Sequence, residues 1–285
     1  MLTLTIEPGA EPGGAPPGRG VNTWADEAGR VFARAFVDDD RRWIDWQGLG
    51  RFAFAPGSTD VRVSPTAGVS LTAIHATFDR VIQPVILQAL GWQALHASGV
   101  AGSRGALIFC GRGRSGKSTL AYVTGQRDGY AQIADDAIVI GQGGGRLHVH
   151  PLPFATGLRQ DAIERLGQDE RFGKPPIPRS SGALRPVASE VDLTPPLPVH
   201  AVFALSQDPA APSGGRAARV APAEAFPLLL THAHCFDQSD AASLRRMVET
   251  YLAMADEVPV YALTYRPDFA NLDMLVNTVI DTAIP

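Results

Sequence analysis

The stretch Gly111-Arg112-Gly113-Arg114-Ser115-Gly116-Lys117-Ser118-Thr119 matches the pattern G-x-x-x-x-G-K-[ST] throughout. The apolar run Ala106–Cys110 before it is typical of a buried strand, and residues 118–124 after it are typical of a helix start. Glycines let successive backbone N–H groups point at one anion, and the helix N-terminus adds partial positive charge. We therefore expect a nucleotide phosphate site, with Lys117 on the β- and γ-phosphates and the Ser118 hydroxyl on Mg²⁺.

Other cations of the chain are harder to assign. Lys117 and Lys174 are the two lysines in 285 residues, whereas arginines are plentiful. A lysine kept inside the loop strengthens the interpretation of a phosphate site. Arg112 and Arg114 could meet the γ-phosphate or an acidic substrate, or be solvated. Lys174 could meet phosphate or substrate, or be an exposed loop residue.

A pair of aspartates follows the loop at an informative distance. Asp135 and Asp136 come after an apolar strand start, and Asp136 lies 19 residues beyond Lys117. That length suits one helix and one returning strand, which would bring the pair back beside the loop. Phosphoryl transfer needs one carboxylate to hold Mg²⁺ and one to receive the proton of the attacking hydroxyl. Two carboxylates this close repel each other, so ionisation of both implies a bound cation.

Further segments accompany the loop: Leu95-His96-Ala97-Ser98 before it, and Ile133-Ala134-Asp135-Asp136 and Val149-His150-Pro151-Leu152-Pro153 after it. Together they resemble the catalytic domain of HPr kinase/phosphorylase, which has a histidine on the strand before its loop and a V-A-D-D run after it. The resemblance spans roughly Trp43 to the C-terminus and is specific from Leu95 to Pro153. The chain is most similar to the divergent HPr-kinase-like group of peptide natural-product pathways, whose kinases phosphorylate a serine of a precursor peptide, lasso-peptide precursors included.

The resemblance implies a role for each matching position. Asp135 would be the general base, and Asp136 and Ser118 would hold Mg²⁺. Lys117 would hold the phosphates, and His96 would lie near the transferred group. The order of the two aspartates along one strand leaves an exchange of their roles open.

One family segment does not match. The E-x-R-G-L-G run is absent, and its nearest counterpart, Gly157-Leu158-Arg159, lacks the leading glutamate. HPr docking, the reverse phosphorylase reaction and the family's hexamer therefore do not follow from the resemblance, and assembly into a homo-oligomer stays open. Arg159 remains a catalytic candidate that would bind charge in the transition state.

The expected fold class is α/β (mixed α+β). The resemblance implies a P-loop kinase domain of the HPr kinase / phosphoenolpyruvate carboxykinase-like type, preceded by a small antiparallel β-rich segment. We divide the chain into a flexible Pro/Gly-rich leader (1–20), a β-rich N-terminal segment (21–73) and the catalytic domain (74–285). Helical spacing over 74–90 is interrupted by Pro84, which predicts a kink or a restart there. Apolar segments predict strands over 130–140, 146–150, 200–205 and 258–265.

Composition excludes several classes. With 25 basic and 29 acidic residues, the net charge of −4 gives no basic field for nucleic acid. The apolar runs fall far short of the roughly 20 residues of a membrane span. The N-terminus lacks the positive region of a secretory signal. Two distant cysteines, Cys110 and Cys235, form no disulfide framework. We expect a cytoplasmic protein without nucleic-acid or membrane partners.

The sequence thus predicts an ATP- and Mg²⁺-dependent kinase acting on a serine hydroxyl of a peptide or protein. Three alternatives stay open: a sugar or nucleoside kinase, a nucleotide-binding regulatory protein with little catalysis, and an ATPase of transport or assembly. The histidines of His148-x-His150 and His232-x-His234-Cys235 have ligand types that suit zinc, but no supporting motif accompanies them. We interpret them as buried or surface histidines.

Overall fold

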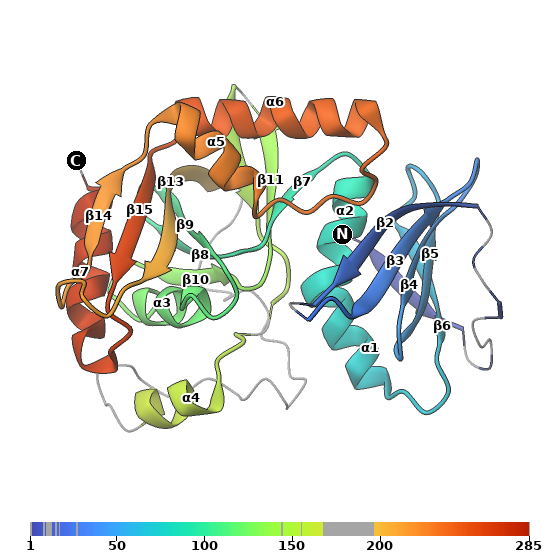
Figure 1. Ribbon diagram of the computed structural model, residues 1–285, viewed down its shortest axis with the longest axis horizontal. Coiled ribbons are helices and arrows are strands. Elements are labelled where there is room, and N and C mark those ends of the chain that lie inside the picture. Colours follow the sequence, from blue (N-terminus) through green and yellow to red (C-terminus); the bar gives the residue numbers. More distant parts are fainter. Residues whose placement is uncertain are drawn as a thin grey trace. The chain divides into compact units, whose positions relative to one another are not determined.

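The computed structural model describes residues 2–7, 9, 13–14, 16, 18–26, 28–143, 145–154, 156–167 and 197–284. The chain forms two compact units (Figure 1). The first comprises Met1–Trp92 and His234–Met247, and the second comprises Gln93–Ala233 and Val248–Pro285. The two units combine helices with two sheets, so the protein is of mixed α/β class, as the sequence predicts.

The first unit is built on a six-stranded sheet of order β1-β6-β5-β4-β3-β2. Neighbouring strands are antiparallel except β1 and β6, which are parallel. Alternate side chains such as Ala33, Ala35 and Phe52 are buried in one core, as expected for strands with one covered face. The strands are β1 (Thr3–Ile6), β2 (Arg19–Ala25), β3 (Val31–Val37), β4 (Arg42–Trp46), β5 (Gly50–Phe54) and β6 (Asp60–Pro65).

The start of the chain differs from the expected leader. Thr3–Ile6 forms an edge strand that pairs with β6 in register, and Leu2 is buried in the core of this unit. Arg51 donates hydrogen bonds to the Gly13 and Gly14 carbonyls at 2.9 and 2.6 Å. The Pro/Gly-rich composition of residues 1–20 hid a short alternating segment at its beginning. The expectation of a leader with almost nothing to bury is therefore wrong for these residues.

The predicted helix over 74–90 consists of three consecutive pieces. These are α1 (Leu71–Thr77), a π-helical turn (Phe78–Ile82) and α2 (Gln83–Ala89). Pro84 is the second residue of α2, directly after the π-helical turn, so the helix restarts at the position that Pro84 predicts. The buried face of these pieces packs on the first sheet through Ile74, Phe78 and Ile86. This unit therefore extends beyond residue 73, where the sequence analysis placed the start of the catalytic domain.

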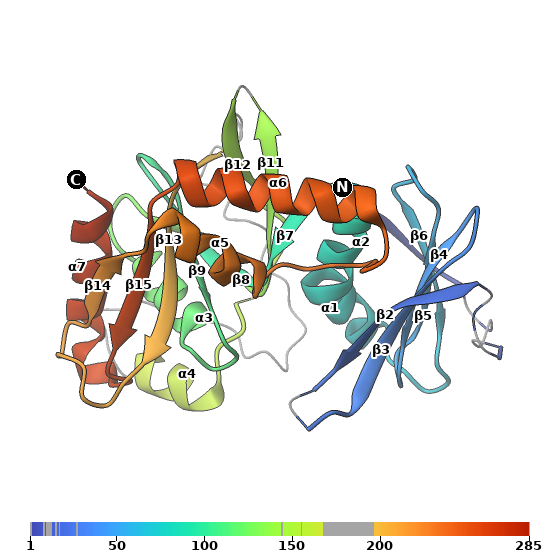
Figure 2. The ribbon, with the colours of Figure 1, turned by 45° about the horizontal axis from the view of Figure 1, so that its top comes forward.

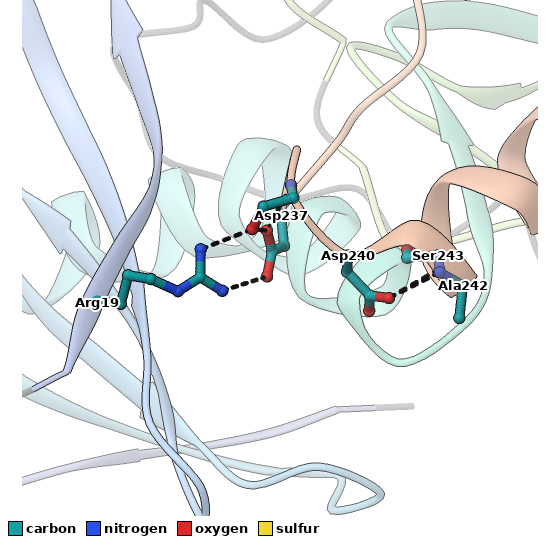
Figure 3. Close-up of polar contacts among 6 residues, drawn as sticks. Arg19, Asp237, Asp240, Ala242 and Ser243 are labelled. Atoms are coloured by element: carbon teal, nitrogen blue, oxygen red, sulfur yellow. Dashed lines mark hydrogen bonds and ion pairs between the residues drawn. The ribbon is translucent and has the colours of Figure 1, made fainter.

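A late segment, 234–247, returns to the first unit. The Phe236 ring packs edge-on against Phe54, with centroids 5.5 Å apart, and its N–H donates to Gln88 Oε1. Figure 3 shows Arg19 of β2 reaching Asp237 on this segment. Asp240 then accepts hydrogen bonds from the N–H groups of residues 242 and 243, so it caps the helix α6 (Ala241–Glu257).

The second unit contains a nine-stranded arrangement in which the long strand β13 belongs to two sheets. Its first residues pair with β12, and the rest pairs in parallel with β9 on one side and β15 on the other. The carboxyl ends of β9, β13 and β15 therefore meet at one sheet edge. The strands are β7 (Gln93–Leu95), β8 (Ala97–Gly102), β9 (Gly105–Gly111), β10 (Ala131–Ala134), β11 (Ile138–Gly143), β12 (Arg146–His150), β13 (Leu197–Gln207), β14 (Arg216–Arg219) and β15 (Val260–Tyr265).

The helices of this unit enclose its core. The helices α3 (Lys117–Thr124) and α7 (Leu272–Ala283) lie in contact with each other and share a core with β9, β13 and β15 (Figure 1). A short 3₁₀ turn capped by Asp268 leads into α7. The helix α4 (Gln160–Gly167) contributes buried side chains to the same core. The helix α5 (Pro222–Leu230) and strand β14 lie where the sequence analysis expected no element.

The aspartate pair lies in a break between two strands. The strand expected over 130–140 is interrupted at the aspartate pair, with β10 ending at Ala134 and β11 starting at Ile138. Figure 2 shows β11 and β12 as a long antiparallel hairpin. Within the part of the chain that the structure describes, no helix is long and apolar enough to cross a membrane.

Candidate active site

The glycine-rich loop joins the end of β9 to the start of α3, as its motif predicts. The backbone curls because Arg114 and Gly116 have φ angles of 64° and 87°, in the left-handed region. A side chain at Gly111 would place its Cβ 2.6 Å from Ser115 Oγ and 2.8 Å from the Leu205 carbonyl oxygen. Both glycines are thus needed for this loop shape.

Lys117 lies inside the loop rather than in solvent. Its side chain is 7% exposed, and Nζ donates hydrogen bonds to the carbonyl oxygens of Gly111 at 2.9 Å and Arg112 at 3.1 Å. The ammonium therefore lies inside the loop and bridges two of its carbonyl oxygens, next to the backbone N–H groups that would bind an anion. Burial raises the pKa of the neighbouring Cys110 thiol to about 12, although the Lys117 charge opposes this, so the thiol is neutral at pH 7.

Residues at the ends of β13 and β15 form hydrogen bonds with the backbone of the loop. Tyr265 Oη donates to the Ser115 carbonyl at 2.7 Å. Gln207 Nε2 is 3.2 Å from both the Arg114 carbonyl oxygen and Tyr265 Oη. Tyr265 and Gln207 thus support the loop through its backbone carbonyls. Sequence reasoning missed both, although Tyr265 ends a predicted strand and Gln207 lies two residues beyond another, predicted over 200–205.

Asp135 is a buried carboxylate with both oxygens occupied. Ser98 Oγ donates to Oδ1 and the Gly157 N–H donates to Oδ2, each at 2.6 Å. Its side chain is 3% exposed. Burial raises the pKa of Asp135, and the charge of Asp136 raises it further, while hydrogen bonds from Ser98, Gly157 and Ser118 lower it. The contact with Ser118 places this carboxylate at the loop, where the spacing of the sequence predicts it.

Asp136 adopts a different environment from its neighbour. Its φ angle is 66°, which breaks the strand between β10 and β11, and its side chain is half-buried. The Asp136 carbonyl oxygen lies 3.0 Å from His96 Nδ1. The structure therefore gathers His96, Ser98 and both aspartates beside Lys117 and Ser118.

A second histidine, His232, joins this group. It follows α5, and its carbonyl oxygen accepts a hydrogen bond of 2.7 Å from the His96 N–H. Burial, together with the charges of Lys117 and His96, lowers the pKa of His232 to about 4. The sequence predicts His232 only as a buried or surface histidine and gives no signal that it lies near the loop.

The remaining cationic candidates lie elsewhere. Arg112 and Arg114 are exposed on the loop, and Thr119 in the first turn of α3 is half-buried. Arg159 is 66% exposed and paired with Asp161 at 3.1 Å, two residues after Gly157. Lys174 lies outside the residues that the structure describes.

The residues present fit a nucleotide with Mg²⁺. Ser115 Oγ is buried and lacks a hydrogen-bond partner among the described residues, so a donor is available inside the loop. No cluster of three or more acidic, histidine or cysteine side chains that could hold a metal occurs in the described ranges. Magnesium needs no such cluster, since it is commonly bound by one or two carboxylates together with substrate phosphates and water. The Ser118 hydroxyl and the aspartates supply hard oxygen ligands of this kind.

Comparisons with known proteins give little beyond this geometry. No family model matches the chain, and no curated protein matches its sequence. Among solved structures, the chain is similar to the Hpr(Ser) kinase/phosphatase from Coxiella burnetii, with a TM-score of 0.36 and 13% sequence identity. That match covers 67% of this chain and 90% of the other.

Proposed function

We propose that this protein is an ATP- and Mg²⁺-dependent kinase that transfers the γ-phosphoryl group to a serine hydroxyl of a peptide or protein. One observation carries the proposal. A buried carboxylate, Asp135, lies against Ser118 of a complete phosphate loop, with Lys117 as the preceding residue. A buried carboxylate at this point indicates a functional role in the site, as a proton acceptor or beside a bound cation, because burial of a charge without function is costly.

The chain's own residues would divide the chemistry as follows. Lys117 turns from the loop carbonyls towards the β- and γ-phosphates, and the loop N–H groups and Ser115 hold phosphate oxygens. Asp135 accepts the proton of the attacking serine hydroxyl while the new O–P bond forms and the bond from the γ-phosphorus to the bridging oxygen breaks. Bound Mg²⁺, held by Ser118 and Asp136, would neutralise charge on the phosphates.

The raised pKa of Asp135 suits a proton acceptor. A carboxylate of ordinary pKa is a weak base at neutral pH, and burial beside Asp136 moves the pKa of Asp135 upward, towards the working pH. Ser98 and Gly157 fix the orientation of the carboxylate through its two oxygens. Arg159 would serve the transition state only after leaving Asp161, which its exposed position allows.

For the acceptor we propose a ribosomally made precursor peptide of the lasso type. The support is the sequence resemblance of Leu95–Ser98 and Val149–Pro153 to the group of kinases with such substrates. The acceptor would have to reach Asp135, whose immediate partners come from β8 and from the segment before α4.

The test is phosphoryl transfer itself. The full-length protein is incubated with ATP and Mg²⁺ and with serine-containing precursor peptides, sugars or nucleosides, and products are identified by mass spectrometry. A mass increase of one phosphate on a peptide serine, absent with Asp135→Asn, is the expected result. Phosphorylation of a sugar or nucleoside alone would replace the acceptor class. Tight ATP binding with no product from any hydroxyl would leave the regulatory protein as the better account.

A further inference from the structure

The segment after α5 is held directly against the strand break that contains His96. Leu95 and Ala233 form an antiparallel bridge, and the His96 N–H donates to the His232 carbonyl oxygen at 2.7 Å. Because these backbone contacts flank both histidines, the two residues are fixed side by side. His96 is in turn held at the aspartate pair by its contact with the Asp136 carbonyl.

His96 and His232 lie opposite each other across this antiparallel bridge, so their side chains leave it on the same side, and the Lys117 charge also acts on His232. His232 is half-buried, and after burial the two groups that depress its pKa are Lys117 and His96. At neutral pH the imidazole is therefore uncharged and keeps one N–H donor and one acceptor nitrogen. Lys117, His96 and His232 thus bring an ammonium and two imidazoles to one place from three separate segments: the loop, the β7–β8 break and the end of α5.

Such a grouping is unfavourable by itself. An ammonium beside imidazoles opposes their protonation, and the charges of Lys117 and His96 both lower the pKa of His232. An incoming phosphoryl group reverses this balance, because its charge is spread over three outer oxygens that accept hydrogen bonds from nitrogen donors. The loop N–H groups would bind the α- and β-phosphates, so a donor from outside the loop is best placed to bind the terminal phosphate.

We propose that His232 is a ligand of the γ-phosphoryl group, acting beside Lys117 and His96. The proposal rests on the proposed function, because it assigns one more residue to the same site. It predicts that His232 distinguishes ATP from ADP, since ADP lacks the group that the imidazole contacts.

The experiment compares ATP and ADP affinities of the full chain by calorimetry at fixed Mg²⁺. The variants are His232→Ala, His232→Gln and Lys117→Ala, with His148→Ala as the matched control. His148 lies on β12 in the same unit, and its strand pairs with β11 and β13. His232→Ala should weaken ATP binding about tenfold or more, the usual effect of losing a hydrogen bond to a charged group, and change ADP binding less than twofold. Lys117→Ala should weaken both nucleotides, and His148→Ala neither.

His232→Gln keeps an N–H donor and should recover part of the ATP affinity. Equal weakening of ATP and ADP by His232→Ala would show a structural role and overturn the proposal, as would no weakening of either. If His232→Ala fails to fold, His232→Gln and His232→Asn carry the same comparison of the two nucleotides. Failure of the proposed function appears separately, as ATP binding by the wild-type protein without transfer to any acceptor.

Discussion

Gly116 and Tyr265 offer a sharp test of how the phosphate loop keeps its shape. A Cβ added at Gly116 would lie 2.1 Å from Tyr265 Oη and 3.3 Å from Tyr265 Cζ. Gly116 also has a φ of 87°, which costs an L-residue about 1–2 kcal/mol. To make room for the methyl group of Gly116→Ala, the hydroxyl must move and give up its 2.7 Å hydrogen bond to the Ser115 carbonyl. Leaving that buried carbonyl unsatisfied costs about 1–3 kcal/mol more.

These two costs sum to about 2–5 kcal/mol, so Gly116→Ala should weaken ATP binding by about 30-fold or more. Tyr265→Phe alone removes only the hydroxyl and should weaken binding by about fivefold or more. In the double variant the severe contact with Oη is gone, and a 3.3 Å contact with the ring remains. The double variant should therefore bind ATP no worse than Gly116→Ala, so the two losses do not add.

The assay is calorimetric ATP binding for the four proteins of this double-mutant cycle, with melting temperature measured in parallel. Gly129→Ala is the matched control, because Gly129 has a φ of 79° and no atom within 4 Å of an added Cβ. It carries the backbone cost without the clash and should leave ATP affinity unchanged. Losses that simply add in the double variant would refute the coupling of Gly116 to Tyr265, and with it the support of the loop by β15.

Three further changes test other contacts of the two units. Lys117→Ala should reduce ATP affinity and turnover together, since each charge-assisted contact contributes about 1.5–3 kcal/mol; unchanged calorimetry and product formation would remove Lys117 from the mechanism. Asp135→Asn should reduce phosphoryl transfer by about 10²–10⁴-fold. Added Mg²⁺ should partly restore product formation by Asp136→Asn and not by Asp135→Asn. Rescue of Asp135→Asn instead would mean that the two aspartates have exchanged roles. Deleting residues 1–7 removes the β1–β6 pairing and the buried Leu2 and should lower the melting temperature by several degrees, and an unchanged melting temperature would show that this strand adds no stability.

The parts of the site that the sequence predicts are those encoded locally. The loop is a contiguous motif whose shape follows from its own glycines, and the strand before it and the helix after it are short-range patterns. The distance from Lys117 to Asp135 needs only one helix and one strand, α3 and β10, so the return to Ser118 could be inferred from chain length. Neither inference depends on how the rest of the sheet is ordered.

The parts that the sequence did not reveal depend on sheet order. Gln207 and Tyr265 reach the loop because β13 and β15 lie parallel to β9, and this arrangement has no local signal in the chain. A usable rule existed, since residues at the carboxyl ends of parallel strands gather at one edge of a sheet, where ligands bind. Applied to the predicted strands at 200–205 and 258–265, it would have pointed to these two residues.

The composition of residues 1–20 does not predict the strand β1, and there is a physical reason for this. Glycine and proline averaged over residues 1–20 indicate a chain that cannot bury surface, yet four alternating residues, Thr3–Ile6, suffice for an edge strand. The partner strand β6 supplies the missing hydrogen bonds, so the stability of β1 comes from pairing and not from its own composition. Local composition is therefore a poor guide for edge strands.

The effect of Asp135 on the stability of the fold can be measured separately from its effect on phosphoryl transfer. A pKa raised in the folded state means that folding favours the protonated carboxyl, so its contribution to stability is present at low pH and is lost as the pH rises through the folded-state pKa. Above that pKa, the ionised, buried carboxylate beside Asp136 is then a cost to the nucleotide-free protein. Asparagine removes the charge but can still accept from the Gly157 N–H and donate to Ser98 Oγ. Asp135→Asn should consequently lose phosphoryl transfer while its melting temperature at pH 7 stays level or rises. A clear drop in melting temperature, measured without nucleotide, would mean that the carboxylate is stabilising there and that Asp135 is held for the fold and not for proton transfer.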